Sequence, residues 1–311
     1  MYSSTHQNKT HHSTLSLNTC NHSSDKKQFK TQIGSITYTQ LKNHTIVIGN
    51  PICKTDQIKN LITLFLITHP KAHFIQISAH TAQYLPNYYI TPIGNEEIID
   101  LATFKLSWQK RKSLKKINNR KHTLSIQEIN KESIDINQLN ALKKNWLNKK
   151  RIKKELTFIF SRPFNQDLPS TRYFIATTNN QLIGLKTFDP LLKNNICIGY
   201  TANHTYITPY PKLSISDLIT LTAIDTFKQE KKQVLNLGLS PFKITTHHPQ
   251  QSILQKLCFT LLYKSSPLFF PFKSISEHKQ KYHAHKIPMY FASKHPLPLK
   301  TLYNIYKKIL S

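Results

Sequence analysis

Three apolar segments joined by short polar turns constrain the fold of this chain more than any other feature. Residues 173–177, 181–188 and 196–201 are rich in the β-branched and aromatic residues that favour strands. Turn-forming residues separate them at Asn179-Asn180 and at 193–195. Consecutive strands joined by short turns predict an antiparallel meander.

A helix, a strand and two further helices follow the meander. Residues 216–229 carry apolar side chains at helical spacing, and residues 234–239 have the composition of a buried strand. Further elements are predicted as helices at 250–262 and 297–310 and a strand at 289–293. A meander followed by helix, strand and helix is similar to the order of elements in the acyltransferase fold called GNAT.

The first part of the chain shows a comparable alternation of strands and helices. Predicted strands lie at 34–40, 45–48, 73–78, 88–93, 98–101 and 124–129, with a turn at Gly94-Asn95, and predicted helices at 57–68 and 106–121. The expected fold is therefore α/β (α+β), with two GNAT-like lobes at 31–130 and 131–311, each a mixed sheet with packed helices. Residues 1–30 are mostly polar and are predicted to form a disordered tail.

The chain has a large excess of positive charge. It contains 43 Lys and Arg residues against 15 Asp and Glu, a formal net charge of +28, concentrated in runs at 106–121 and 143–154. Leu106, Leu114 and Ile117 share one face of the first run, which predicts a basic helix with one apolar stripe. The excess predicts a phosphate-rich partner, namely RNA, DNA or an anionic membrane face, and composition does not choose among these three. An AT-rich genome would also raise the Lys content, and composition does not separate the two explanations.

Cysteine, histidine and hydropathy patterns exclude several classes of protein. Four scattered cysteines without CxxC spacing predict reduced thiols, and neither a disulfide framework nor a metal site. The longest apolar run, at 61–67, is much shorter than the roughly 20 residues that cross a bilayer. We therefore expect a cytoplasmic protein without a transmembrane segment, able to lie at the inner face of the membrane.

Four motifs resemble one family of bacterial enzymes. Residues 93–121 resemble the segment of phosphatidylglycerol lysyltransferases in which a Gly-x-Glu-x-hydrophobic-x-Asp-Leu strand precedes a basic helix. Residues 146–155 resemble the family's Trp-Leu-x-x-Lys region, and residues 236–242 (NLGLSPF) its Asn-Leu-Gly-x-Ala-Pro turn. Residues 272–290 are similar to its closing block of Phe-Lys, Phe-Lys-x-Lys-Phe and Pro-x-Tyr. The motifs occur in the family's order across residues 33–311.

The resemblance implies a catalytic module that moves an aminoacyl group from a charged tRNA to a lipid hydroxyl, typically of phosphatidylglycerol. It implies no cofactor other than aminoacyl-tRNA as co-substrate. Many relatives carry an amino-terminal membrane flippase, which we do not expect here. The acceptor hydroxyl attacks an ester that is already activated, so the protein must orient the substrates, accept a proton and stabilise an oxyanion.

Candidate site residues follow from these requirements and from the motifs. We expect Lys279 to stabilise an oxyanion or phosphate, and Glu155 or His204 to accept the proton. Substrate-binding residues are expected at Arg111, Lys115, Lys149, Arg151, Asn203, Asp217, Ser240 and Lys281.

The segment after the strand that ends at Tyr200 departs from the family pattern. Asn203 and His204 align with the family's acidic residue, Ile207 with its Arg and Ser214 with its Gly, while Asp217 keeps its character. Isoleucine removes a bidentate donor for phosphate or carboxylate. One alternative is therefore a catalytically inactive module that binds tRNA or anionic lipid.

A CoA-dependent GNAT acyltransferase is a second alternative. Such enzymes bind the pyrophosphate with an Arg/Gln-x-x-Gly-x-Gly/Ala loop before a helix. The chain has six glycines and none in that spacing, which disfavours CoA. The run at 267–272 (PLFFPF) fits either a core segment or a lipid contact.

Overall fold

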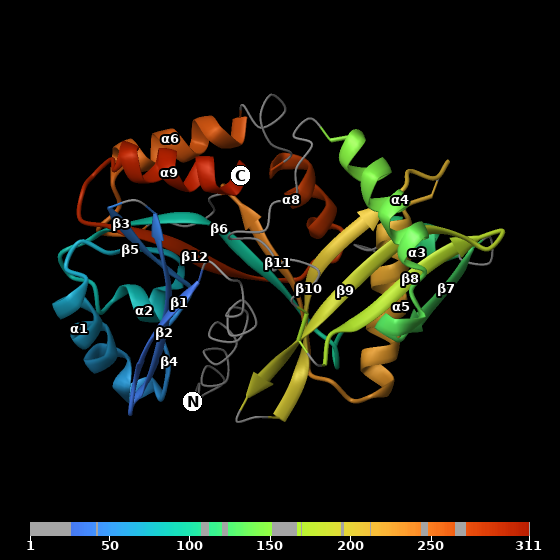
Figure 1. Cartoon of the computed structure of the whole chain (residues 1–311), viewed down its shortest axis with the longest axis horizontal. Helices are drawn as coiled ribbons and strands as arrows, with labels where there is room; N and C mark the ends of the chain where they lie inside the picture. The colour runs from blue at the N-terminus through green and yellow to red at the C-terminus, as the bar shows by residue number, and fades with distance from the viewer. Residues whose placement is uncertain are drawn as a thin grey trace, which may run out of the picture.

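The computed structural model describes residues 26–41, 43–106, 112–119, 124–150, 167–168, 170–193, 196–211, 213–243, 248–264 and 272–310 (Figure 1). The strands are β1 (Lys27–Thr31), β2 (Gly34–Leu41), β3 (His44–Ile48), β4 (Ile52–Cys53), β5 (His73–Ser78), β6 (Tyr89–Asp100), β7 (Ser125–Ile129), β8 (Arg172–Thr178), β9 (Gln181–Lys193), β10 (Ile196–Ile207), β11 (Val234–Pro241) and β12 (His285–Ser293). The helices are α1 (Ile58–Thr68), α2 (Ala79–Ala82), α3 (Lys112–Asn118), α4 (Ile136–Asn148), α5 (Ile215–Gln229), α6 (Ile253–Lys264), α8 (Phe272–Gln280) and α9 (Leu299–Leu310).

One mixed sheet of twelve strands runs through the described residues. Its order is β1-β2-β3-β5-β12-β6-β11-β10-β9-β8-β7, with β4 beside β2. The meander β8-β9-β10 is antiparallel as predicted, and β11 joins β10 in parallel after the crossover helix α5. The two expected lobes share this sheet, because β6 pairs with both β11 and β12. The lobe boundary near residue 130 stays a prediction.

The long strand β6 corrects the prediction of two short strands around a turn at Gly94-Asn95. Gly94 pairs with Pro241 on one side and with Met289 on the other. Its φ is +139°, and a Cβ atom built on it would lie 2.2 Å from the carbonyl oxygen of Ser240. Glycine is therefore required by close backbone approach. Hydrogen-bonding neighbours on both sides keep the backbone extended where local composition predicts a turn.

Strand β1 reaches into the range 1–30, for which the composition predicts a disordered tail. It pairs antiparallel with β2 from Lys27↔Tyr38 to Thr31↔Gly34. Phe29 packs against the ring of Phe65 on α1, with centroids 5.5 Å apart. The prediction was therefore wrong for residues 27–30, where a tertiary contact outweighs polar composition.

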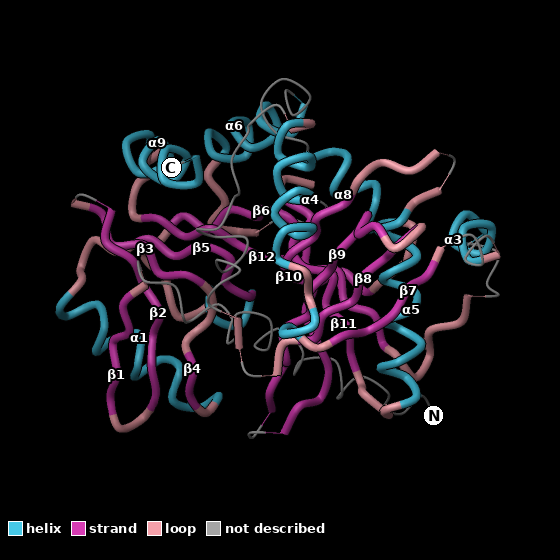
Figure 2. The backbone as a smooth tube through the Cα atoms, turned by 45° about the vertical axis from the view of Figure 1, so that its right-hand side comes forward, coloured by secondary structure: helices cyan, strands magenta, loops and turns pink. Residues whose placement is uncertain are grey.

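Helices cover both faces of the sheet. Figures 1 and 2 show α1, α2 and α5 on one side, and α4, α6, α8 and α9 on the other. Under α5, the rings of Phe174, Phe188 and Phe227 meet edge to face with centroids 5.5 to 5.7 Å apart. Under α6 and α9, Phe259 and Ile305 join one buried cluster with strand residues of β3, β6 and β12.

Helix α3 is the described part of the predicted basic helix. Leu114 is fully buried, and Leu106 and Ile117 pack on the same core under α5. This confirms the apolar face of the helix for Leu114 and Ile117, while Leu106 reaches the same core from a turn before α3. Residues 107–111 and 120–123 lie outside the described residues.

Candidate functional site

Strands β10 and β11 separate in the middle of the sheet, and the candidate site lies at this opening. The two strands pair over only three positions, from Gly199↔Val234 to Thr201↔Asn236. Beyond them, β10 has a bulge between Ala202 and Thr205 and follows β9. Strand β11 has an irregularity after Asn236 and follows β6. Bulges bend strands, so both irregularities turn the backbones apart.

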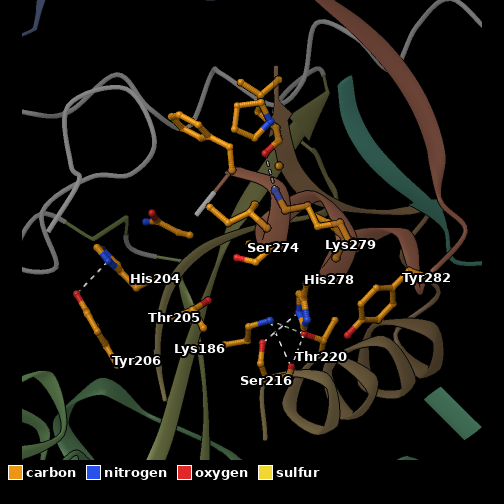
Figure 3. Close-up of a pocket in the computed structure, with 18 of the residues that line it drawn as sticks. Lys186, His204, Thr205, Tyr206, Ser216, Thr220, Ser274, His278, Lys279 and Tyr282 are labelled. Atoms are coloured by element: carbon orange, nitrogen blue, oxygen red, sulfur yellow. Dashed lines mark hydrogen bonds between the residues drawn. The ribbon is translucent and has the colours of Figure 1, made fainter. Parts of the chain in front are cut away.

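A cavity of about 430 Å³ fills the opening (Figure 3). Side chains from β9, β10, β11, α4, α5 and α8 line it, so that both faces of the sheet contribute. Among the described lining residues are three lysines, Lys150, Lys186 and Lys279, and no acidic residue. Two histidines, His204 and His278, also line it. The cavity therefore has a positive lining.

Lys186 is a buried cation in the middle of β9. Its side chain points into the cavity toward α5, where Nζ donates to Oγ1 of Thr220 at 2.6 Å and to the carbonyl oxygen of Ser216 at 3.4 Å (Figure 3). Burial lowers the pKa of Lys186 to about 8, against the opposing effect of the Asp217 charge. A lysine in this position is available to bind a developing negative charge.

Lys279 reaches the cavity from the last turn of α8. Its Nζ donates to the carbonyl oxygen of Leu239 on β11 at 2.8 Å. Burial lowers the pKa of Lys279 to about 8, although the carboxylates of Glu97 and Glu96 act in the opposite direction. The charge of Lys186 also lowers the pKa of Lys279, but the pKa values of both lysines stay near 8, so two cations share one cavity near neutral pH.

Asp217 joins α5 to the end of α8. Its carboxylate is fully buried and accepts from Nζ of Lys281 and from the hydroxyl of Tyr282, each at 2.8 Å. Burial alone would raise the pKa of Asp217, but His278 and the hydrogen bond from Lys281 hold it below the usual range. Ser214 caps α5 by accepting from the Asp217 N–H. Asp217 is therefore ionised, and its hydrogen bonds hold Lys281 and Tyr282, which follow α8, against α5.

His278 lies on α8, and its imidazole faces the first turn of α5. Its Nε2 is 3.3 Å from Oγ of Ser216 and 3.4 Å from Oδ1 of Asp217. Burial lowers the pKa of His278 to about 4 against the opposing effect of the Asp217 charge, and the charges of Lys186, Lys281 and Lys279 lower it further. The imidazole is therefore neutral at physiological pH. The Ser216 hydroxyl can donate or accept, so the contact at Nε2 is compatible with either tautomer of the imidazole.

Two predicted residues on β10 are held by neighbouring side chains. His204 is buried, and its Nδ1 lies 3.1 Å from the hydroxyl of Tyr206. Asn203 donates from Nδ2 to Oδ2 of Asp189 at 2.8 Å. Both residues line the cavity on its α4 side, where Trp146 also lies.

The structure separates the remaining predicted residues. Ser240 is buried and donates to Oε1 of Glu97 at 2.7 Å, outside the lining. Lys281 is tied to Asp217, whereas Lys149 at the end of α4 and Lys115 on α3 are exposed and do not line the cavity. The predicted residues Arg111, Arg151 and Glu155 lie outside the described residues. The motifs at 236–242 and 272–282 do meet at one cavity.

Sequence reasoning missed Lys186, Ser216, Thr220 and His278. Lys186 lies between Leu185 and Thr187 in a correctly predicted strand, where alternation makes an outward-facing lysine equally plausible. The only available signal for His278 was its place beside Lys279 in the closing motif.

Within the described ranges, no helix is long and apolar enough to cross a bilayer, and no three His, Cys, Asp or Glu side chains group as metal ligands would. Both findings concern only those residues.

Comparisons with known proteins give the family. The chain matches the family described as "Phosphatidylglycerol lysyltransferase, C-terminal" over residues 5–293. No protein of curated function matches its sequence.

Solved structures give the fold. L-PGS from Bacillus licheniformis is 18% identical, with a TM-score of 0.72 over 92% of this chain and 87% of that chain. The C-terminal domain of a lysylphosphatidylglycerol synthetase from Agrobacterium fabrum is 15% identical, with a TM-score of 0.72 over 91% and 88%. A conserved protein from Bacteroides thetaiotaomicron is 10% identical, with a TM-score of 0.57 over 89% and 88%. At these identities the likeness shows the fold, and the mixed α/β prediction with GNAT-like architecture is confirmed. Since the family match spans nearly the whole sequence, the chain belongs to the phosphatidylglycerol lysyltransferase C-terminal family.

Proposed function

We propose that this chain transfers an aminoacyl group from an aminoacyl-tRNA to a hydroxyl group of an anionic phospholipid of the phosphatidylglycerol type. The observation that carries the proposal is the cavity between β10 and β11, with three lysines and no acid in its described lining. Lysine ammonium groups bind phosphate and stabilise negative charge on oxygen. Both substrates contain phosphodiesters, and the reaction develops an oxyanion, so this lining suits the reaction.

The proposed reaction forms one ester and breaks another. The lipid hydroxyl oxygen attacks the carbonyl carbon of the aminoacyl ester, and the bond from that carbon to the ribose oxygen of the tRNA breaks. The proton of the lipid hydroxyl ends on the ribose oxygen. The reaction needs neither a protein nucleophile nor a cofactor, so positioning and oxyanion stabilisation remain as the tasks of the protein.

Lys279 and Lys186 are proposed to stabilise the oxyanion or a substrate phosphate. Both Nζ atoms donate to protein oxygens, and a substrate oxygen would replace or share those contacts. His278, whose imidazole is neutral, joins His204 and Glu155 as a group proposed to move the proton.

The segment between β10 and α5 disfavours CoA as the donor. It contains Pro209 and Pro211, which have no backbone N–H to offer a pyrophosphate. The ionised carboxylate of Asp217 lies in the first turn of α5, where a bound pyrophosphate would need a positive field.

A binding module without catalysis is the second candidate, and Ile207 favours it. This residue stands where the family has Arg, and it packs as a partly buried side chain against the core under α5. The same cavity would then bind its ligands without transfer.

The test incubates the purified chain with a set of radiolabelled aminoacyl-tRNAs and phosphatidylglycerol vesicles, and follows the label into the lipid fraction. Lys186→Met keeps an unbranched side chain of similar length and removes the cation, so it should lower the transfer rate by about a hundredfold. Exposed Lys273→Met on α8 is the matched control. Transfer by Lys186→Met within about twofold of wild type would contradict the role of the cavity. Tight tRNA binding without transfer for any aminoacyl-tRNA would establish the second candidate.

A further inference from the structure

Helix α6 is apolar on the face that points away from the sheet. Ile253 is 82% exposed, Leu254 is 52% exposed, and Leu257 and Leu261 are each 56% exposed. The opposite face of the same helix buries Gln255 and Phe259. A helix on the surface of a globular protein normally carries polar side chains on its outer face. The outer face of α6 is therefore an exposed apolar stripe.

Helix α9 extends this stripe. Its outer face shows Leu299 and Tyr303, each 62% exposed, while Thr301 and Ile305 are buried on its inner face. Phe259 of α6 and Ile305 of α9 belong to one buried cluster, so both helices cover the same face of the sheet. Figures 1 and 2 both show α6 and α9 side by side at the upper edge of the molecule. We call the outer faces of α6 and α9, with the exposed residues just named, the α6–α9 surface.

The charged side chains of the α6–α9 surface are all basic. The sequences of α6 (ILQKLCFTLLYK) and α9 (LKTLYNIYKKIL) contain no Asp or Glu. Lys264, Lys300 and Lys307 are exposed beside the apolar side chains. An apolar face flanked by lysines is the pattern of helices that lie in the headgroup region of an anionic bilayer. A second copy of the chain fits less well, because a twofold contact would bring these lysines near one another.

The surface also adjoins the cavity. Helix α6 contacts α8, and Phe272, the first residue of α8, lines the cavity. A bilayer against α6 and α9 would thus lie beside a helix that contacts α8, the element that carries Lys279.

We propose that the α6–α9 surface docks the chain on an anionic lipid bilayer, with its apolar side chains inserted among the lipids and its lysines against the headgroups. This inference rests on the proposed function in one respect: the bilayer would supply the phospholipid that accepts the aminoacyl group. Docking itself needs no tRNA and is measured without it.

The experiment measures binding to large unilamellar vesicles by co-sedimentation. One set of vesicles contains equal parts phosphatidylcholine and phosphatidylglycerol, and the other contains phosphatidylcholine alone. Leu257→Glu/Leu261→Glu changes two exposed positions and should weaken binding to the mixed vesicles by more than about tenfold. Ile67→Glu is the matched control, because Ile67 is a 71% exposed residue on α1, on the other side of the sheet. It should bind as wild type does.

A second variant tests the charges. Lys264→Gln/Lys300→Gln/Lys307→Gln should reduce the preference for phosphatidylglycerol and the loss of binding with added salt. Circular dichroism and thermal unfolding establish that each variant is folded. Vesicle binding of Leu257→Glu/Leu261→Glu within about twofold of wild type overturns the proposal. So does a wild-type dimer, measured by light scattering, that this variant dissociates.

Docking and catalysis can fail separately. Leu257→Glu/Leu261→Glu should lose transfer to vesicle lipid and keep transfer to a short-chain phosphatidylglycerol dissolved as monomers. Equal losses with both lipids would overturn docking as the cause. If the wild type binds mixed vesicles through this surface and transfers nothing, docking stands and the proposed transferase function fails.

Discussion

The Nζ atom of Lys281 lies 2.8 Å from Oδ2 of Asp217, a carboxylate with no solvent exposure at the start of α5. This contact fixes the turn after α8 to α5. Lys279, two residues earlier, instead donates to a backbone carbonyl in the cavity. The two lysines of this motif therefore make different contacts. Lys281 neutralises the buried carboxylate of Asp217, whereas the ammonium group of Lys279 lies at the cavity.

Replacing Lys281 with methionine should lower the free energy of unfolding. The buried carboxylate would lose its cation, which costs about 3 to 5 kcal/mol in fully buried pairs. Because the Lys281 side chain is 34% exposed, we expect about 1 to 3 kcal/mol, measured by urea unfolding. Lys281→Met/Asp217→Asn should recover part of the loss, because no charge is then left alone. Equal stability of Lys281→Met and wild type would show that Tyr282 and His278 suffice for Asp217.

Lys279→Ala should lower turnover by about two to three decades, the usual effect of removing one oxyanion donor. Folding should change little, because the variant loses one hydrogen bond, from Nζ of Lys279 to the carbonyl oxygen of Leu239. Binding of tRNA should also change little. Lys273→Ala, on the same helix and 59% exposed, is the control. Turnover of Lys279→Ala within about twofold of wild type would remove Lys279 from the site.

The transfer rate should fall as the pH rises above about 8. Lys186 and Lys279 both have a pKa of about 8, so each loses its charge in this range. The contribution of these two lysines to folding stability changes with pH in the opposite direction to the transfer rate. The folded pKa values lie below the ordinary 10.5, so the unfolded chain binds more protons between about pH 8 and 10.5, and this contribution to stability increases with pH. Initial rates corrected for spontaneous ester hydrolysis, with urea unfolding in the same buffers, separate lost catalysis from unfolding. A rate that stays flat up to pH 9.5 would contradict the charge requirement.

Neutralising Lys110, Arg111, Lys115 and Lys116 together should weaken tRNA binding. Each lost phosphate contact should also flatten the slope of log affinity against log salt by roughly 0.7 to 0.9 units. Lys115 and Lys116 are exposed on α3, and no acidic residue occurs in 106–121 to offset them. The charge-matched control replaces the exposed Lys27, Lys54, Lys59 and Lys71 of the other half of the molecule. Equal affinities of the two quadruple variants would show that overall charge, and not this helix, attracts tRNA.

Apolar periodicity predicted most elements of the fold because each is a local pattern. The helix with Leu218, Leu221, Ile224 and Phe227, and the three strands before it, exist as predicted, although β9 and β10 continue to Lys193 and Ile207, beyond the predicted ends at residues 188 and 201. Long-range pairing has no such signal. Gly94 looks like a turn residue in sequence, and only the strands on both sides of β6 make it extended.

The candidate site was predicted in part. Lys279, His204 and Asn203 do line the cavity, because the motifs that contain them meet at the separation of β10 and β11. Lys186 could not be distinguished from a surface lysine, because its burial depends on Thr220 and Ser216 in a helix about 30 residues later. Ser240 was predicted to lie in a turn, but it lies within β11, where it pairs with Asn95 of β6 and its hydroxyl donates to Glu97 of that strand, a long-range contact that the sequence does not show.

The position of β12 determines the order in which this protein can assemble during synthesis. Strands β5 and β6 are not neighbours; β12, which ends at Ser293, lies between them and pairs with both. The first half of the nascent chain therefore leaves the ribosome with one edge of β5 and both edges of β6 unpaired, because β11 and β12 lie in the second half, and the sheet is not complete until β12 has emerged. Exposed edges of this kind favour aggregation, and contacts over such sequence distances slow folding. Efficient production should therefore depend on chaperones that protect these edges until the last strand arrives.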